Sequence, residues 1–278
     1  MRVSTTPISA LLTVQAAQLT TEYPSDVIPA VLAIAHKDLQ AACYHYQQAQ
    51  FAQAQQKFTT ALSYYTQAQE PVGIGKSLNG LSAVYLQLES VGQALACSQA
   101  AVAALEETAA TTNYAIALYH LGISHSEMQH PHAAERCLTQ ALELFEILGD
   151  RAYENEVLLH LGQLYLHQSQ FTFALACYRA VLDSLLQHPT QEHIHEQLKQ
   201  VLSLMMQLCT QTKTGEAAIS SFQTLLEQHI PTAAPRLVAR LIQQLGQFHE
   251  SQEEYRLALE CYAQALQTIP PVAIDPSH

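Results

Sequence analysis

Histidine is the residue type that could most readily do chemistry in this chain, because it occurs 14 times in 278 residues. Its imidazole titrates near neutral pH and is a common ligand of zinc and copper. His193 and His195 lie in the segment 187–197, flanked by Glu192 and Glu196. A metal site needs three or four converging ligands, and histidines in solvated loops are far commoner than ligands. We therefore predict no metal centre, and a zinc or copper site in this segment is left as the alternative.

Cysteine is the second candidate for metal or redox chemistry, but its spacing indicates a structural role. Cys97, Cys137 and Cys177 are 40 residues apart, and Cys261 lies 84 residues further on, which is two periods plus four residues. A residue that recurs at one phase of a repeat recurs in one environment, so these thiols are expected to be small, buried and unreactive. No CxxC, HExxH or glycine-rich phosphate-binding motif occurs. We therefore predict neither enzymatic activity nor a cofactor.

The elements that must position any site are helices, because the same period of about 40 residues runs through most of the sequence. Apolar side chains within a unit recur at helical spacing, and little alternating strand pattern is present. Small side chains let two helices approach closely, and their phase is held by Ala42, Ser82, Gly122, Gly162 and Gly246, with Met206 in the fifth unit. An alanine follows twelve residues after each. The pattern predicts an all-α solenoid of about six helix pairs.

This pattern resembles the tetratricopeptide repeat (TPR) family. The family's motif has a leucine–glycine pair, a tyrosine three residues later, and then an alanine, an aromatic residue and an alanine in the second helix. Unit four matches it best, through Leu161, Gly162, Tyr165, Ala174 and Tyr178. The resemblance covers about residues 30–268 and is to the long-period members, which include adaptor and regulatory proteins. It implies a right-handed superhelix in which the first helices of successive units line a concave groove.

The chain divides into three predicted segments. Residues 1–26 form an N-terminal segment with a candidate capping helix, residues 27–268 form the six-unit solenoid, and residues 269–278, with three prolines, form a disordered tail. The net charge of −12 argues against a nucleic-acid partner, which needs a basic face. No apolar run reaches the length of about 18 residues that spans a bilayer. With six thiols that are expected to stay reduced, these features predict a cytoplasmic protein.

The resemblance places a polar, nearly uncharged set of side chains on or near the groove. They are Lys76, Asn79, Gln87, Tyr119, His120, Glu127, Glu156, His160, Gln163, His167, Gln200, Gln207, Arg240, Gln243 and Gln247. Their amides can both donate and accept hydrogen bonds, as an extended peptide or a helix would require, and the histidines are expected to become charged near pH 6. For any one of these residues, a solvated helix face is the alternative. Lys76 and Asn79 have no Lys or Arg counterparts at the matching positions of units three to five, which argues against the family's clamp for chaperone tails.

Two classes of function remain. The first is a scaffold or adaptor, for example a complex-assembly factor, that binds a partner protein or peptide in the groove. The alternative is a regulatory receptor whose curvature changes when a peptide binds. A competing contact surface is the end of the solenoid around Leu259 and Tyr262, which could bind a partner or a second copy of the chain.

Overall fold

The structure, a computed structural model, describes residues 27–187 and isolated helical residues between 201 and 264. Every regular element over 27–187 is an α-helix, which confirms the all-α class for the described residues. In chain order the helices are α2 (Ile28–Gln47), α3 (Phe51–Gln67), α4 (Pro71–Gln87), α5 (Val91–Leu105), α6 (Thr111–Glu127), α7 (Pro131–Leu148), α8 (Arg151–His167) and α9 (Phe171–Gln187). The predicted segments 1–26 and 269–278 lie outside the described residues, as do the segment 187–197 after its first residue and most of units five and six.

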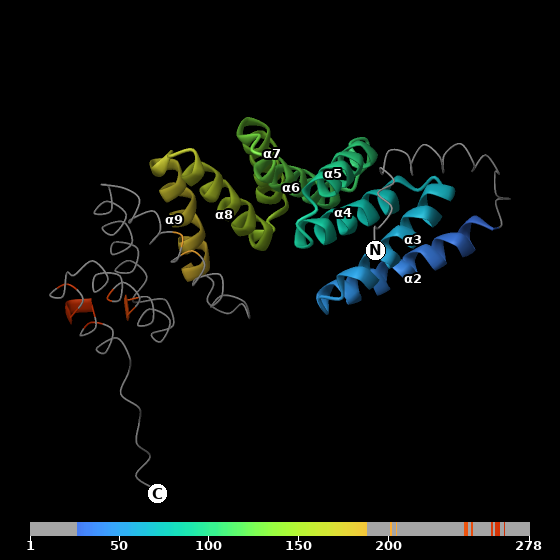
Figure 1. Cartoon of the computed structure of the whole chain (residues 1–278), viewed down its shortest axis with the longest axis horizontal. Coiled ribbons are helices and arrows are strands. Elements are labelled where there is room, and N and C mark those ends of the chain that lie inside the picture. The colour runs from blue at the N-terminus through green and yellow to red at the C-terminus, as the bar shows by residue number, and fades with distance from the viewer. Residues whose placement is uncertain are drawn as a thin grey trace, which may run out of the picture. The chain divides into compact units, whose positions relative to one another are not determined.

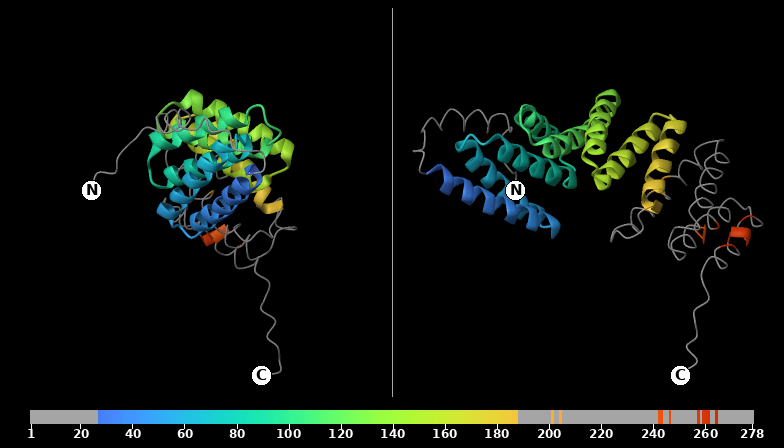
Figure 2. Two further views of the ribbon diagram at one scale, coloured as in Figure 1. Left: turned by 90° about the vertical axis from the view of Figure 1, so that its right-hand side faces the viewer. Right: turned by 180° about the vertical axis from the view of Figure 1, so that it is seen from behind.

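The chain divides into two compact units, Met1–Val157 and Leu158–His278, with the boundary inside α8. In the first unit α2 packs on α3, α4 on α5 and α6 on α7, and α3 and α5 also pack on the first helix of the next pair (Figures 1 and 2). The first helices contact each other as well, α2 with α4 and α4 with α6. In the second unit, Gly162 of α8 lies against the ring of Tyr178 on α9. Consecutive helix pairs are the arrangement predicted for a solenoid.

The helices follow the 40-residue period with little drift. The second helix of each pair begins at residue 51, 91, 131 and 171. Each turn before it contains a residue with left-handed backbone, with φ of 54° at Ala49, 55° at Glu89, 58° at Gln129 and 59° at Ser169. This conformation lets the amide of Gln50 donate to the carbonyl of His45 at 2.9 Å, and the same bond closes the later turns. The left-handed conformation costs a non-glycine residue about 1–2 kcal/mol. None of these four turn positions is a glycine, so the sequence does not signal the conformation.

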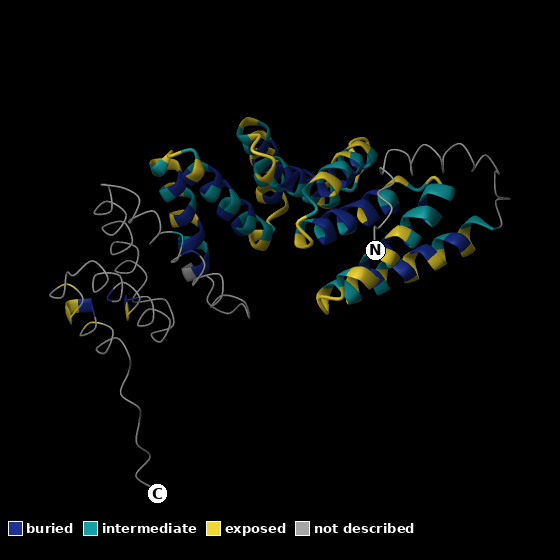
Figure 3. Ribbon diagram, in the orientation of Figure 1, coloured by how far each residue is buried: buried dark blue, intermediate teal, exposed yellow. Residues whose placement is uncertain are grey.

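The predicted phases of small residues are the most buried positions of the four described pairs. Figure 3 shows the buried residues along the sides of the helices that face one another. At the alanine phase of the second helix the exposed fraction is 0% for Ala54, Ala94, Ala134 and Ala174. A Cβ built on Gly122 would lie 2.6 Å from Cγ of Leu138, so a larger residue does not fit at that crossing. Close helix contact therefore explains the repeat of small residues.

The cysteines of the repeat are mostly buried, as predicted. Cys97, Cys137 and Cys261 are buried, whereas Cys177 is only half-buried and Cys43, outside this phase, is exposed. Burial raises the pKa of Cys97 to about 12. Burial also raises the pKa of Cys177 to about 11, and a backbone hydrogen bond opposes that shift. A raised pKa leaves little of the reactive thiolate at neutral pH. The low reactivity of these thiols stays a prediction.

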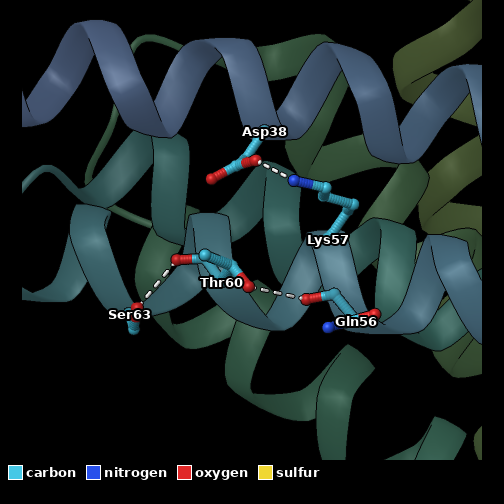
Figure 4. A network of polar contacts seen from close by, with 5 residues as sticks. All are labelled: Asp38, Gln56, Lys57, Thr60 and Ser63. Carbon is cyan, nitrogen blue, oxygen red and sulfur yellow. Dashed lines mark hydrogen bonds and ion pairs between the residues drawn. The ribbon is translucent and has the colours of Figure 1, made fainter.

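One ion pair links the first helix pair. Nζ of Lys57 on α3 donates to Oδ1 of Asp38 on α2 at 2.7 Å (Figure 4). Nearby, Oγ1 of Thr60 donates to the carbonyl of Gln56, and Oγ of Ser63 donates to the carbonyl of Thr60. Because the lysine side chain is 42% exposed, the pair contributes at most about 1 kcal/mol. Its main consequence is that the charge of the nearly buried Asp38 is neutralised.

Candidate functional site

The first unit contains a cavity of about 580 Å³ between its first helices. Side chains from α2, α4, α6 and the first turns of α8 form its wall, with one ring from α3. The lining residues are Leu39, Cys43, Tyr46, Gln47, Phe58, Lys76, Asn79, Gly80, Ala83, Asn113, Ile116, Tyr119, His120, Tyr153 and Glu156. The groove predicted along the first helices is therefore hollowed in this part of the chain.

Repeat spacing explains why these residues meet. Side chains 40 residues apart hold the same position on successive first helices, so they form rows across the groove. Asn79 and Tyr119 share one row, and Gly80 and His120 share another. A Cβ on Gly80 would lie 2.2 Å from Cε1 of Phe58, so glycine at this point lets the phenylalanine ring reach the cavity.

Asn79 presents an unsatisfied hydrogen-bond acceptor. The residue is 6% exposed, and its Nδ2 donates to the backbone carbonyl of Asn113 at 2.8 Å. Its Oδ1 accepts no hydrogen bond from the residues that the structure describes. Leaving a buried polar atom unpaired costs about 1–3 kcal/mol.

Tyrosine rings form the wall between α6 and α8. The rings of Tyr119 and Tyr153 meet edge to face with centroids 6.2 Å apart. Tyr153 also stacks on Phe145 of α7 at 4.7 Å, with 6° between the planes. Burial, and then the charge of Glu156, raises the pKa of Tyr119 far above its usual value. Both effects keep the phenol protonated, so it can donate a hydrogen bond.

A third tyrosine belongs to α2. Burial raises the pKa of Tyr46, and a hydrogen bond with the side chain of Gln87 opposes that shift. This contact places Gln87, which is exposed at the end of α4, beside the cavity. Aromatic rings with polar edges suit a protein-binding surface, because they bury large areas while keeping a hydrogen-bonding group.

The structure brings together only some of the residues named from the sequence. Lys76, Asn79, Tyr119, His120 and Glu156 line the cavity. Glu127 is exposed at the end of α6 and is not part of the lining. The remaining described members belong to the second unit: His160, Gln163 and His167 on α8, and the exposed helical residues Gln243 and Leu259. Gln200, Gln207, Arg240, Gln247 and Tyr262 lie outside the residues whose side chains are described.

The sequence analysis missed several lining residues. Tyr46, Tyr153, Asn113 and Ile116 were not assigned to the groove, although all four line the cavity. A signal for Ile116 was present, since it lies midway between Lys76 and Glu156 in one row of the repeat. Tyr46 had no such signal, because its position relative to the groove depends on how α2 packs on α4.

For His160 the expectation of a charge near pH 6 is wrong. Burial lowers the pKa of His160 to about 4, because the imidazolium would lose its hydration. In the unfolded chain the pKa is about 6.5. The unfolded state therefore takes up the proton first as the pH falls. The stability that neutral His160 contributes is complete above about pH 6.5 and is lost as the pH falls toward 4.

We expect this loss to be visible in the free energy of unfolding. Between pH 7 and pH 4.5 the protein should lose about 1–2.5 kcal/mol more than a His160→Gln variant. Urea unfolding followed by circular dichroism at the two pH values measures the difference. Equal pH dependence in the two proteins would show that the imidazole is not held neutral by burial.

The described residues offer neither a metal site nor a membrane span. Over residues 27–187 and the isolated positions that follow, no group of three or more His, Cys, Asp or Glu residues could hold a metal ion. His193 and His195 fall outside this part of the chain. Within the part that the structure describes, no helix has both the length and the apolar character needed to cross a bilayer.

Comparison with known proteins agrees with the fold. Two family models, both of the tetratricopeptide repeat, match residues 73–147 and residues 239–271. No curated protein sequence matches the chain significantly. Among solved structures, the apo form of RapI is similar over 94% of this chain and 89% of its own, with 14% identity and a TM-score of 0.54.

Two further structures show the same likeness. A Rap protein complexed with Competence and Sporulation Factor matches over 94% of this chain and 70% of its own, with 15% identity and a TM-score of 0.54. PilF of Pseudomonas aeruginosa matches over 87% of this chain and 95% of its own, with 15% identity and a TM-score of 0.55. At such identities the likeness establishes the fold alone. The two family models identify residues 73–147 and 239–271 as tetratricopeptide repeats, and the four described helix pairs have the arrangement expected of a protein built from such repeats.

Proposed function

We propose that the protein is a non-enzymatic interaction scaffold that binds an extended segment of a partner protein in the cavity of its first unit. The observation that carries the proposal is a cavity of about 580 Å³ whose wall combines tyrosine rings with side-chain amides. A peptide backbone offers one N–H and one C=O group per residue, so it can pair with side-chain amides of the wall while its side chains pack on the tyrosines.

The composition of the wall supports this ligand. Tyr46, Tyr119 and Tyr153 supply large rings, and Asn113 and Gln47 add side-chain amides. Tyrosine is a frequent anchor of interfaces because it buries much area at little cost in side-chain entropy. The Rap protein of similar fold was solved in complex with Competence and Sporulation Factor, which is a further reason to expect a polypeptide ligand.

Filling the cavity tests the proposal. Ala83 of α4 lines the cavity, and Ala83→Trp would occupy the space that a ligand needs. Ala103→Trp makes the same change at an exposed position of α5 outside the lining and serves as the matched control. A random-peptide phage library is panned over the wild type and both variants. We expect the wild type and Ala103→Trp to enrich the same peptides, and Ala83→Trp to lose at least about tenfold in affinity for them.

Other outcomes would replace the proposal. If Ala83→Trp keeps the affinity of the wild type, the cavity is not the binding site. If Leu259→Asp removes binding instead, the contact surface is the exposed Leu259 in the C-terminal part of the chain. If the wild type self-associates and Ala83→Trp abolishes that association, the occupant is a second copy of the chain.

A regulatory receptor is the second candidate function. It is favoured by one observation: the cavity wall is shared by the first helices of four successive pairs, so a ligand would fix the angles between those helices. Distance measurements between labels on exposed Gln53 of α3 and exposed Arg136 of α7, with and without an enriched peptide, separate the two functions. A shift on binding supports the receptor, and constant distances support the scaffold.

A further inference from the structure

The cavity carries opposite charges in one row of its wall. Lys76 on α4, Ile116 on α6 and Glu156 on α8 hold the same position in successive repeats, and all three line the cavity. The row therefore runs from an ammonium group, through an aliphatic side chain, to a carboxylate. Lys76 is exposed and Glu156 is partly exposed, so both can meet a ligand.

Both charged side chains belong to the wall of the cavity. The carboxylate of Glu156 is close enough to the tyrosine wall that its charge, after burial, helps raise the pKa of Tyr119. Asp38 and Lys57, which precede the lining residues Leu39 and Phe58, form an ion pair with 2.7 Å between Nζ and Oδ1. Their charges cancel, so the pair gives the cavity no net charge. Apart from the imidazole of His120, Lys76 and Glu156 are the basic and acidic side chains among the lining residues.

The separation of the two charges fits a short extended chain. α4 contacts α6, and the ring contact of Tyr119 with Tyr153 brings α6 to α8. Axes of packed helices lie about 8–10 Å apart, so two steps place Lys76 and Glu156 about 16–20 Å apart. An extended chain rises about 3.3 Å per residue, and it covers that separation in about five or six residues.

We propose that the cavity selects an extended peptide segment with an acidic and a basic residue about five or six positions apart and an apolar residue between them. The acidic side chain pairs with Lys76, the apolar one packs on Ile116 and the tyrosine rings, and the basic one meets Glu156. This inference rests on the proposed peptide-binding function and adds the charge pattern of the ligand. Complementary charge favours the correct partner, and a like charge at either end disfavours the others.

Charge reversal at each end tests the pattern. The probes are immobilised eight-residue peptides with leucine or tyrosine at the centre and flanking pairs of Glu/Arg, Arg/Arg, Glu/Glu or Gln/Gln. The wild type is expected to bind the Glu/Arg peptides about tenfold more tightly than the Gln/Gln peptides. Lys76→Glu should shift the preference to Arg/Arg by about tenfold, and Glu156→Lys should shift it to Glu/Glu by a similar factor. A misfolded variant would lose affinity for all four classes of peptide. A gain in affinity for a new class therefore reports the changed charge and not a damaged fold.

Two control variants make the same charge changes elsewhere. Arg136→Glu and Glu143→Lys alter exposed positions of α7 outside the cavity lining, and both should keep the preference of the wild type. If the wild type binds all four classes equally and Ala83→Trp abolishes that binding, the charge pattern is wrong and the groove function stands. If Ala83→Trp leaves binding unchanged, the groove function itself fails. If none of the four classes binds, the inference is overturned, and the random-peptide library decides the proposed function.

Discussion

Replacing Phe145 by alanine is expected to lower the free energy of unfolding by about 3–5 kcal/mol. Phe145 on α7 is 0% exposed, and its ring stacks on Tyr153 of α8 at 4.7 Å. The truncation removes this stacked contact and leaves a void that the flanking helices cannot fill without moving. Urea unfolding followed by circular dichroism measures the loss, and the midpoint should fall with it.

The matched control lies two residues away on the same helix. Ile147 is 80% exposed, so Ile147→Ala should change the free energy of unfolding by less than about 0.5 kcal/mol. Because Phe145 supports Tyr153, and Tyr153 lines the cavity, Phe145→Ala should also weaken binding of the peptides that the wild type selects. Similar losses from the two substitutions would mean that the stacked pair is not a specific contribution to stability.

Gly122→Ala is expected to destabilise the protein by about 1–3 kcal/mol, although alanine is the better helix former. The added Cβ would lie 2.6 Å from Cγ of Leu138 and 3.3 Å from its backbone nitrogen. Leu138 is 0% exposed, so its side chain has no free space to move into. The two helices α6 and α7 must then separate, and neighbouring contacts weaken with them. Thermal or urea unfolding of the variant measures the effect.

Gly92→Ala is the control with the opposite expected sign. Gly92 lies in α5, and a Cβ there would meet no atom within 4 Å. The substitution should therefore stabilise the protein by up to about 1 kcal/mol through helix propensity alone. If both alanine variants were more stable than the wild type, the crossing at Gly122 would have room to spare, and small residues would not be required by helix packing.

The sequence was sufficient for the helix pairs because their determinants are local and repeated. Apolar residues at helical spacing fix where each helix lies, and a small residue at a fixed phase marks where two helices touch. These two rules predicted the buried alanines such as Ala94 and Ala134 and the tight contact at Gly162. The left-handed residues in the turns, such as Glu89, were not predictable in this way, because none of them is a glycine. A local backbone hydrogen bond, from the amide of Ser90 to the carbonyl of Tyr85, closes the turn.

The site was predictable only in outline. The resemblance placed Lys76, Asn79, Tyr119 and His120 on the groove, and all four line the cavity. It could not separate them from Glu127, which has the same polar character and lies outside the lining. Whether a residue lines the cavity depends on the angles between successive helices. These angles vary with the side chains of both packed helices and leave no periodic signal in the sequence.

Tertiary structure also decided the chemistry of the site. The side chain of Asn79 is buried, and its Nδ2 donates to the backbone carbonyl of Asn113 on the next first helix, while its Oδ1 accepts no hydrogen bond from the described residues. This pairing depends on how α4 packs on α6, which the sequence pattern does not show. Burial lowers the pKa of His160, and how far a side chain is buried follows from how the helices pack. Thus the sequence by itself determined the helices and their repeat, since these follow from local patterns. The cavity, its unpaired acceptor and the charge state of its surroundings depended on contacts between distant residues, which only the folded chain brings together.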